Sequence, residues 1–356
     1  MKKLLLLLVL IIPFRVNAYS TSATSAVLMD MDSLNVIYSK DMHNVRSIAS
    51  ISKIMTAIVA IENSNLSDVV TIGEEINKAY GSGIYIKNGE EITLEALIYG
   101  LMLRSGNDAA LAIANYVGGD VDSFVKLMNE KAVEIGMKNT KFNNPHGLDE
   151  NGGNLSTAYD MAILTSYAMK NEQYQKIVST KKYTLKTNMN YYSWTNKNKL
   201  LHSNKYITGG KTGFTDMAKR TLVTTASKDN VNLVAVTLND GNDFQDHINL
   251  FEEAFKNFTN FSILKKGEIN IIDENYYNKK LYINNDFNYS LENKDKNKVL
   301  LNFKLEKKRD YQSGDEVGIV EVVINNNKVH EEKIYIDIKE ELSFFDKLKA
   351  WFDNLW

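Results

Sequence analysis

The chain has 356 residues, of which 44% are hydrophobic and 24% charged, and its formal net charge is -2 at pH 7. This length and hydrophobic content can bury a sizeable core and are typical of two domains rather than one. The small net charge, with no block rich in Lys and Arg, argues against nucleic acid as a partner. The sequence contains no cysteine, so the fold depends on its core and not on disulfides.

The N-terminus has the pattern of a secretory signal peptide. Met1-Lys2-Lys3 is followed by an apolar run from Leu4 to Phe14 and then by Val16-Asn17-Ala18, a small-residue cleavage site. The run is shorter than the roughly 20 residues that a transmembrane helix needs, so an uncleaved anchor is the less favoured alternative. We therefore assign residues 1–18 to the signal and expect the mature protein to begin near Tyr19.

The next 240 residues or so alternate between strand and helix patterns. The segment "AVLMDMDSLNVIYSKD" predicts a β-hairpin around Asp32-Ser33. Apolar periodicity then predicts five helices, over 50–61, 94–103, 107–117, 122–135 and 156–170. Thr93 is expected to cap the second, Gly136 to end the fourth and Ser156 to cap the fifth. Strand patterns return at 182–187, 191–194, 221–227 and 231–239, and a helix follows at 243–258. This order predicts an α/β (α+β) fold, in which a sheet lies beside a helical subdomain.

The composition changes beyond residue 260 to short Tyr, Ile and Val segments separated by turn residues. It predicts a small all-β domain over 260–338, with a hairpin turn at Asn325-Asn326-Asn327. The last segment, 339–356, has the pattern of an amphipathic helix whose apolar face carries Phe344, Leu348, Trp351, Phe352 and Leu355. That face could dock on the β domain, but we favour contact with the membrane surface, because a terminal helix is poorly held unless something covers it.

The first candidate for chemistry is the stretch "SIASISKIMT". On a helix, residues three apart share a face, so Ser50 meets Lys53, whereas Ser52 points away from it. The spacing alone is weak, because a serine at this point can simply cap the helix. It also recurs elsewhere in the chain, at Ser123/Lys126, Ser179/Lys182 and Ser262/Lys265.

Two further motifs single out the first pair. Ser105-Gly106-Asn107 lies at a break between two apolar helices, and Lys211-Thr212-Gly213 lies on a strand with glycines beside it. Ser-x-x-Lys, Ser-x-Asn and Lys-Thr-Gly together are typical of class A β-lactamases and penicillin-binding proteins. Only the pair at Ser50 precedes both other motifs and opens an apolar helix.

Consecutive segments between about residues 20 and 260 extend the likeness: "IASISKIMTA", "GSGIYIKNGEEITLEALIYGLMLRSGNDAALAIANYVGG", "MKNTKFNNPHGLDENGG", "LSTAYDMA", "NKLL" and "GGKTGFTDMAKRTLV". They make the chain resemble the low-molecular-mass penicillin-binding proteins, which are serine-type D-alanyl-D-alanine carboxypeptidases with a β-lactamase/DD-peptidase-like fold. The resemblance implies a catalytic domain over 19–259, followed by the small β domain and the C-terminal amphipathic helix. It also implies an exported enzyme at the outer face of the bacterial cytoplasmic membrane or in the cell wall. The implied substrate is a peptidoglycan stem peptide ending in D-Ala-D-Ala, with β-lactams as covalent inhibitors and no cofactor or metal.

The chemistry of such a site requires a neutral lysine. A serine hydroxyl is a poor nucleophile until a base takes its proton, and a lysine that is charged at neutral pH cannot do so. Burial and a second ammonium group, that of Lys211, would favour the neutral form of Lys53. The resemblance then implies that Ser50 attacks the peptide carbonyl, that Ser105 relays the proton to the departing amine, and that Asn107 fixes Lys53 and the substrate amide.

The same resemblance assigns the substrate-binding residues. Lys211 and Thr212 would bind the terminal carboxylate, and Gly213 would let an extended peptide lie along the strand edge. The backbone N–H groups of Ser50 and Phe214 would stabilise the oxyanion. The family's additional arginine near the carboxylate has no secure counterpart here, and Arg220 is the candidate.

Two alternative functions remain open at this stage. A class A-like β-lactamase needs a Glu-x-x-Leu-Asn motif to activate the deacylating water; Glu150 and Asn154 have the spacing, but the leucine is missing. The other alternative is a non-catalytic, membrane-tethered protein that binds the cell wall. The five histidines show no spacing typical of metal ligands, and His146 within "NNPHGL" is expected to be structural.

Overall fold

The computed structural model describes residues 19–271, 277, 280–307 and 310–337. The predicted signal peptide, 1–18, and the predicted terminal helix, 339–356, lie outside the described residues. The chain forms two compact units that divide between Asn257 and Phe258, two residues before the boundary expected from composition. No helix within the described residues is both long and apolar enough to cross a bilayer.

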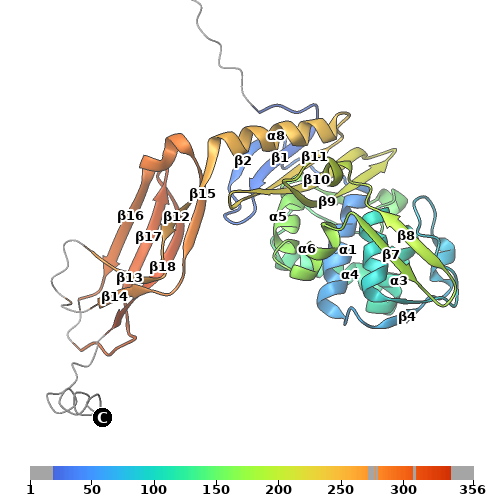
Figure 1. The fold of residues 1–356 in the computed structure, drawn as a ribbon, viewed down its shortest axis with the longest axis horizontal. Helices are drawn as coiled ribbons and strands as arrows, with labels where there is room; N and C mark the ends of the chain where they lie inside the picture. Colours follow the sequence, from blue (N-terminus) through green and yellow to red (C-terminus); the bar gives the residue numbers. More distant parts are fainter. Residues whose placement is uncertain (1–18, 272–276, 278–279, 308–309, 338–356) are drawn as a thin grey trace, which may run out of the picture. The chain divides into compact units, whose positions relative to one another are not determined.

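A five-stranded antiparallel sheet organises the first unit, with the strand order β2-β1-β11-β10-β9 (Figure 1). Its strands are β1 (Ser25–Asp30), β2 (Val36–Lys40), β9 (Ile207–Thr215), β10 (Lys219–Lys228) and β11 (Val231–Leu238). The predicted hairpin is therefore present, because β1 and β2 pair around Asp32-Ser33. Strand β9 pairs with β10 alone and forms one edge of the sheet.

Helices cover both faces of this sheet. Helix α8 (Asp243–Asn257) packs on β10 and β11, and α5 (Ala158–Ala168) packs on β1 and β11 from the other face (Figure 1). Helix α1 (Lys53–Asn63) lies on the α5 side and contacts it. Alternate residues of the strands, such as Val27 and Met29, enter the same core as Ile54 of α1, as the period of a strand requires. This arrangement holds the start of α1 next to strands β9 and β10.

The remaining elements complete the helical subdomain beside the sheet. The helical ones are η1 (Ala49–Ser52), η2 (Glu74–Lys78), α2 (Leu94–Tyr99), the π-helical η3 (Gly100–Arg104), α3 (Asn107–Gly118), α4 (Val121–Glu134), η4 (Glu150–Gly152), α6 (Glu172–Val178) and α7 (Lys199–Ser203). The short strand pairs are β3 (Arg46–Ser47) with β6 (Leu155–Ser156), β4 (Val69–Thr71) with β5 (Glu91–Thr93), and β7 (Lys182–Lys186) with β8 (Tyr191–Thr195).

The helix starts were predicted with mixed success. Thr93 caps α2 as expected, since its hydroxyl accepts the N–H of Ala96 at 3.3 Å. The prediction that Ser156 caps the fifth helix is wrong, because Thr157 accepts the N–H of Asp160 at 3.0 Å and caps α5. Ser156 lies instead in strand β6. Two adjacent hydroxyl residues are equally good caps from sequence, and the strand pairing decides between them.

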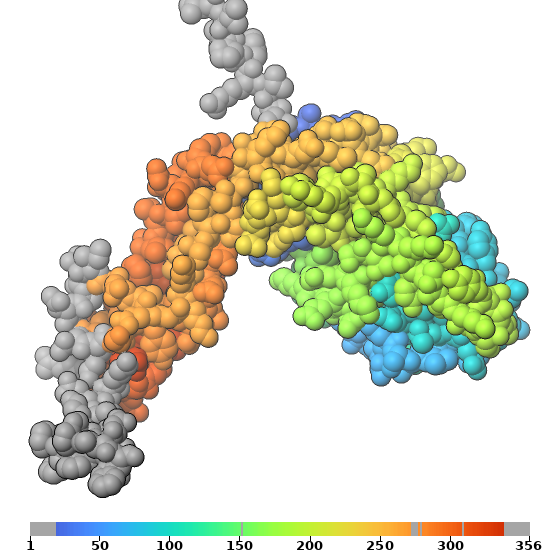
Figure 2. Space-filling model, in the orientation of Figure 1, coloured from blue at the N-terminus to red at the C-terminus, as the bar shows by residue number. Residues whose placement is uncertain are grey.

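The N-terminal end of the described chain lies beside α8, although the two are far apart in sequence (Figure 2). The backbone N–H of Ser22 donates to Asp246 at 2.6 Å, and the Ser22 hydroxyl donates to Asp240 at 2.6 Å. These bonds attach the start of the described chain to α8, which ends the first unit, and to the loop before it.

The second unit is made of strands, as its composition predicts. It contains the pair β12 (Phe258–Leu264) and β15 (Phe287–Glu292), and a five-stranded sheet of β13 (Gly267–Ile269), β14 (Lys280–Ile283), β18 (Asn327–Asp337), β17 (Glu316–Ile324) and β16 (Val299–Leu305), with the short helical η5 (Asn293–Lys298). Asn325 and Asn326 connect β17 to β18 with φ of 51° and 64°. Two positive φ angles are those of a type I′ hairpin turn, for which asparagine is well suited.

Candidate active site

Ser50 lies in the short 3₁₀ turn η1, immediately before α1 begins at Lys53. The N-cap positions of η1 and α1 are Ile48 and Ser52, so Ser50 is not the helix cap that sequence alone would suggest, and its hydroxyl donates to the carbonyl oxygen of His146 at 3.4 Å. The preceding residue, Ala49, is fully buried with φ of 50°, a conformation that residues other than glycine seldom adopt. Backbone strain of this kind concentrates at functional sites, where the surrounding structure holds it in place.

The Lys53 amino group is completely buried and lies next to the Ser50 hydroxyl. Its Nζ is 3.1 Å from Ser50 Oγ, 2.7 Å from Asn107 Oδ1 and 2.5 Å from the backbone carbonyl oxygen of His146. A neutral amine has two N–H bonds and one lone pair. If the N–H bonds go to the two shorter contacts, the lone pair is directed at the Ser50 hydroxyl and can accept its proton.

The surroundings favour that neutral form. Burial lowers the pKa of Lys53 well below its usual value, and the positive charges of Lys211 and Lys197 lower this pKa further. The carboxylate of Asp108 acts in the opposite direction but is a smaller influence. The sequence-based expectation included burial and Lys211, whereas the contribution of Lys197 was missed.

Ser105 and Asn107 contact the two buried lysines from the break between η3 and α3. Ser105 has a left-handed backbone with φ of 64°, which ends the preceding helical segment and turns its side chain toward Lys211. Asn107 Nδ2 donates to the carbonyl of Tyr80 at 2.6 Å, and its backbone N–H donates to that of Ser82 at 2.7 Å. Asn107 therefore links Lys53 to the loop that forms one side of the site.

Lys211 reaches the same place from strand β9. Its side chain is 2% exposed, and its Nζ donates to Ser105 Oγ at 3.0 Å and to the carbonyl oxygen of Thr212 at 2.6 Å. Burial, followed by the positive charge of Lys197, lowers the pKa of Lys211 to about 7. Ser105 therefore connects Lys211, on the sheet, to the break that precedes Asn107 at the start of α3.

Close backbone packing explains the glycine after Thr212. A Cβ atom on Gly213 would lie 2.4 Å from Thr221 Oγ1 and 3.0 Å from the backbone nitrogen of Ser50. Only glycine lets β9 approach the nucleophile this closely without displacing a neighbour.

A cavity of about 440 Å³ opens above these groups. Six of the predicted residues line it: Ser50, Ser105, Thr212, Gly213, Phe214 and Arg220. Lys53, Asn107 and Lys211 lie buried beside the lining residues and are connected to them by the hydrogen bonds given above. The lining also contains residues that sequence reasoning did not select, namely Ser82, Lys197, Lys199, Asp243 and Phe244.

Phe214 and Arg220 both lie at this cavity. Phe214 is 62% exposed at the edge strand. Arg220 pairs with it across β9 and β10, and its Nη2 is 2.5 Å from Asp243 Oδ1. Arg220 therefore lies at the mouth of the cavity, but as half of an ion pair that the sequence did not predict.

The signals for the missed groups are weak. His146 contributes its backbone carbonyl, which has no side-chain signature, while burial lowers the pKa of its imidazole to about 3. Gly147 has φ of 84°, and a Cβ there would lie 2.1 Å from the carbonyl oxygen of Ala49. Glu150, the residue that a lactamase would need, is exposed in η4 and has no hydrogen bond to Ser50 or Lys53.

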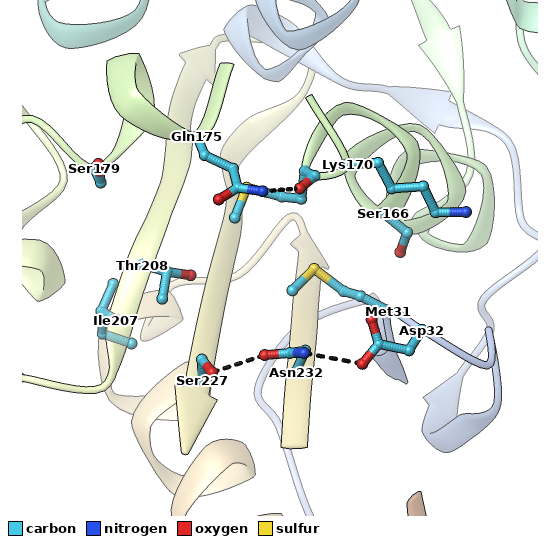
Figure 3. A pocket seen from close by; sticks show the side chains of 11 residues that line it. Met31, Asp32, Ser166, Lys170, Gln175, Ser179, Ile207, Thr208, Ser227 and Asn232 are labelled. Atoms are coloured by element: carbon cyan, nitrogen blue, oxygen red, sulfur yellow. Dashed lines mark hydrogen bonds between the residues drawn. The ribbon is translucent and has the colours of Figure 1, made fainter. Parts of the chain in front are cut away.

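A larger hollow of about 720 Å³ lies elsewhere in the first unit and contains none of these groups (Figure 3). Three of its polar side chains are linked to one another, since Ser227 donates to Asn232 at 2.7 Å and Asn232 donates to Asp32 at 2.9 Å (Figure 3). Chemistry rather than volume identifies the smaller cavity as the candidate site. Among the described residues, no group of three or more His, Cys, Asp or Glu side chains could hold a metal ion.

Known proteins share both the sequence and the fold. The family model described as Peptidase_S11, D-alanyl-D-alanine carboxypeptidase, matches residues 13–242. The carboxypeptidase DacF of Bacillus subtilis is 38% identical over 228 residues, which are 62% of this chain and 58% of that protein. DacC of Escherichia coli is 36% identical over 63% of this chain and 58% of its own length. The alignments thus span little more than half of these two relatives.

A solved structure extends the likeness to the second unit. Penicillin-binding protein 5 of Haemophilus influenzae matches with a TM-score of 0.76 and 27% identity, over 90% of this chain and 98% of that one. The predicted fold, an antiparallel sheet with a helical subdomain followed by a small all-β unit, is confirmed by this agreement. With a family model that covers more than half of its length, the chain belongs to the D-alanyl-D-alanine carboxypeptidase family, Peptidase_S11.

Proposed function

We propose that the protein is a serine-type D-Ala-D-Ala carboxypeptidase that removes the terminal D-alanine from peptidoglycan stem peptides. The observation that carries the proposal is the 3.1 Å contact between Ser50 Oγ and the buried Nζ of Lys53. The family of the chain and the names of its relatives agree with this activity.

The reaction begins with proton transfer from Ser50 to the neutral amine of Lys53. Ser50 Oγ then attacks the carbonyl carbon of the penultimate D-alanine, and the new C–O bond gives a tetrahedral oxyanion. Its charge is stabilised by the backbone N–H groups of Ser50 and Phe214. Preorganised donors of this kind are worth about 10²–10³-fold in rate.

The oxyanion collapses with cleavage of the C–N bond. The leaving amine needs a proton, which passes from the protonated Lys53 through the hydroxyl of Ser105, 3.0 Å from Lys211 Nζ, so that Lys53 becomes neutral again. The departing D-alanine leaves an ester on Ser50. Water then attacks this ester, again with Lys53 as base, and releases the shortened peptide and the free serine.

Binding follows from the strand edge and its positive charges. An extended peptide can align along β9, and its terminal carboxylate meets Lys211, Thr212 and the guanidinium of Arg220. A β-lactam presents a carboxylate and a reactive carbonyl in similar positions, so it should acylate the same serine.

The cellular setting is part of the proposal. Residues 1–18 would direct export, and 339–356 would attach the enzyme to the outer face of the bacterial cytoplasmic membrane, with the catalytic domain over 19–259 and the β domain over 260–338. The net charge of -2 gives no reason to expect nucleic acid as a partner.

Two serines in one turn provide the test. A fluorescent penicillin should label the wild type and Ser52→Ala but not Ser50→Ala. Ser52 is the matched control, because its hydroxyl donates to the carbonyl of Ala49 at 2.8 Å and is fully buried. Mass spectrometry of a pentapeptide should show loss of one alanine. Label that remains in Ser50→Ala would overturn the proposal, rapid penicillin turnover would indicate a lactamase, and no label on folded protein would indicate a binding protein.

A further inference from the structure

The position of Arg220 relative to the carboxylate-binding strand follows from the register of the sheet. Arg220 is paired with Phe214, and Leu222 with Thr212, across the antiparallel strands β10 and β9. Paired residues project from the same face, and residues two apart on one strand share that face. Arg220 and Thr212 are therefore diagonal neighbours on one face, at a separation that a long side chain can span.

The Arg220 side chain is held by the first turn of α8. Asp243 Oδ1 accepts a hydrogen bond from Arg220 Nη2 at 2.5 Å, and its side chain is 3% exposed. The ring of Phe244 lies under the guanidinium, with 5.4 Å between Cζ and the ring centroid. The backbone is fixed as well, since the carbonyl of Arg220 accepts the N–H of Asp240 at 3.1 Å.

This arrangement leaves most of the guanidinium free to bind. The contact with Asp243 uses one of five N–H groups, and Arg220, Asp243 and Phe244 all line the cavity that contains Ser50. A guanidinium held from behind by a carboxylate and from below by a ring can present its other edge to a second carboxylate in a bidentate geometry.

The positive charges near Arg220 explain why its guanidinium needs a negatively charged partner. Lys197 and Lys199 line the same cavity, and Lys211 lies beside it. Without a negative partner, these cations would repel Arg220 toward solvent, where its long side chain has other rotamers available. Among the residues that line the cavity, Asp243 is the one carboxylate.

We propose that Asp243 and Phe244 are positioning residues that hold Arg220 against the carboxylate of the departing amino acid, so that the first turn of α8 sets the specificity for the leaving group. This inference rests on the proposed carboxypeptidase function. It assigns to the site a preference for a leaving group with a free carboxylate next to the departing nitrogen.

The test compares two peptide substrates that differ only at the C-terminus. One ends in D-Ala-D-Ala with a free carboxylate, and the other carries the corresponding C-terminal amide. Asp243→Asn keeps an oxygen that can accept the N–H of Phe244, a bond of 2.7 Å in the wild type, but removes the charge that holds Arg220. We expect the ratio of kcat/KM for acid over amide to fall about tenfold, mainly through a higher KM for the acid, because one charge-assisted contact is weakened.

A double-mutant cycle separates positioning from general stability. In an Arg220→Ala background, Asp243→Asn should change the ratio by less than about twofold, since the group it positions is already gone. Phe244→Leu should lower the ratio in the same direction as Asp243→Asn. Glu252→Gln is the matched control, because it removes one exposed negative charge from the same helix and should leave the ratio unchanged.

The outcomes distinguish the two proposals. If the wild type releases no D-alanine, the proposed function itself fails. If the wild type is active and Asp243→Asn leaves the ratio unchanged, or lowers it equally with and without Arg220, then Asp243 only joins β10 to α8 and the positioning role is overturned.

Discussion

Replacement of Lys53 by arginine tests the central requirement for a neutral base. Arginine keeps the positive charge and a long side chain but has a pKa above about 12, so less than about 10⁻⁵ of it is neutral at pH 7. The group that lies 3.1 Å from Ser50 Oγ could then no longer accept a proton.

The expected magnitude follows from the step that is lost. General base catalysis typically contributes about 10²–10⁴-fold, so acylation of Lys53→Arg should slow by that factor, which corresponds to about 3 to 5 kcal/mol of activation free energy. The wild-type contacts to Asn107 and the carbonyl of His146 are compatible with a donor, so the variant has partners for its N–H groups.

The assay is the second-order rate constant for labelling by a fluorescent penicillin, with thermal unfolding measured in parallel. Lys126→Arg is the matched control, because Ser123 and Lys126 repeat the same spacing on α4, where the Lys126 side chain is 78% exposed. It should label at the wild-type rate. A folded Lys53→Arg protein that labels within tenfold of the wild type would refute the idea that this amine is the base.

Three further predictions concern Lys211 and the packing under Ser50. Lys211 must be charged to bind a carboxylate, and its pKa is lowered to about 7. KM for the pentapeptide should therefore rise above pH 7, by up to tenfold per pH unit. Lys211→Met should have a high KM that does not depend on pH in this way. The same lowered pKa affects stability, because between about pH 7 and 10 the unfolded chain binds more protons at Lys211 than the folded chain does. The unfolding free energy of the wild type, relative to that of Lys211→Met, should therefore rise with pH by at most about 1.4 kcal/mol per unit. A fall in this difference would contradict the lowered pKa. Gly147→Ala should lower the unfolding free energy, measured by chemical denaturation, by about 1–3 kcal/mol and should slow labelling by the fluorescent penicillin. The reason is that Gly147 has φ of 84° and that a Cβ atom there would lie 2.1 Å from the Ala49 carbonyl oxygen, so η1 would have to move. An unchanged labelling rate would show that η1 tolerates this movement.

The sequence predicted the parts of the site that depend on local spacing. Ser50 and Lys53 are one helical turn apart, and this distance is fixed whatever the rest of the chain does. Ser105 and Lys211 were found because their motifs are rare in combination, and they meet through a single 3.0 Å hydrogen bond. Their roles in catalysis stay predictions that the labelling experiments test.

Groups that act through the backbone, or that come from distant elements, could not be found in this way. The carbonyl of His146 is the shortest contact of Lys53, yet any residue has a carbonyl. Asp243 is 23 residues from Arg220, and only the packing of α8 on β10 brings them together. Similarly, apolar periodicity does not reveal that α1 is preceded by the 3₁₀ turn η1, which begins at Ala49 with φ of 50°.

The open edge at β9 has a consequence for the behaviour of the protein at high concentration. An unpaired edge is a template on which any extended polypeptide could add and begin an aggregate. Lys197, Lys199 and Arg220 line the cavity together with Thr212, Gly213 and Phe214 of this strand, and natural edge strands commonly carry such charges as gatekeepers. Their positive charges therefore disfavour association with other polypeptides through this edge.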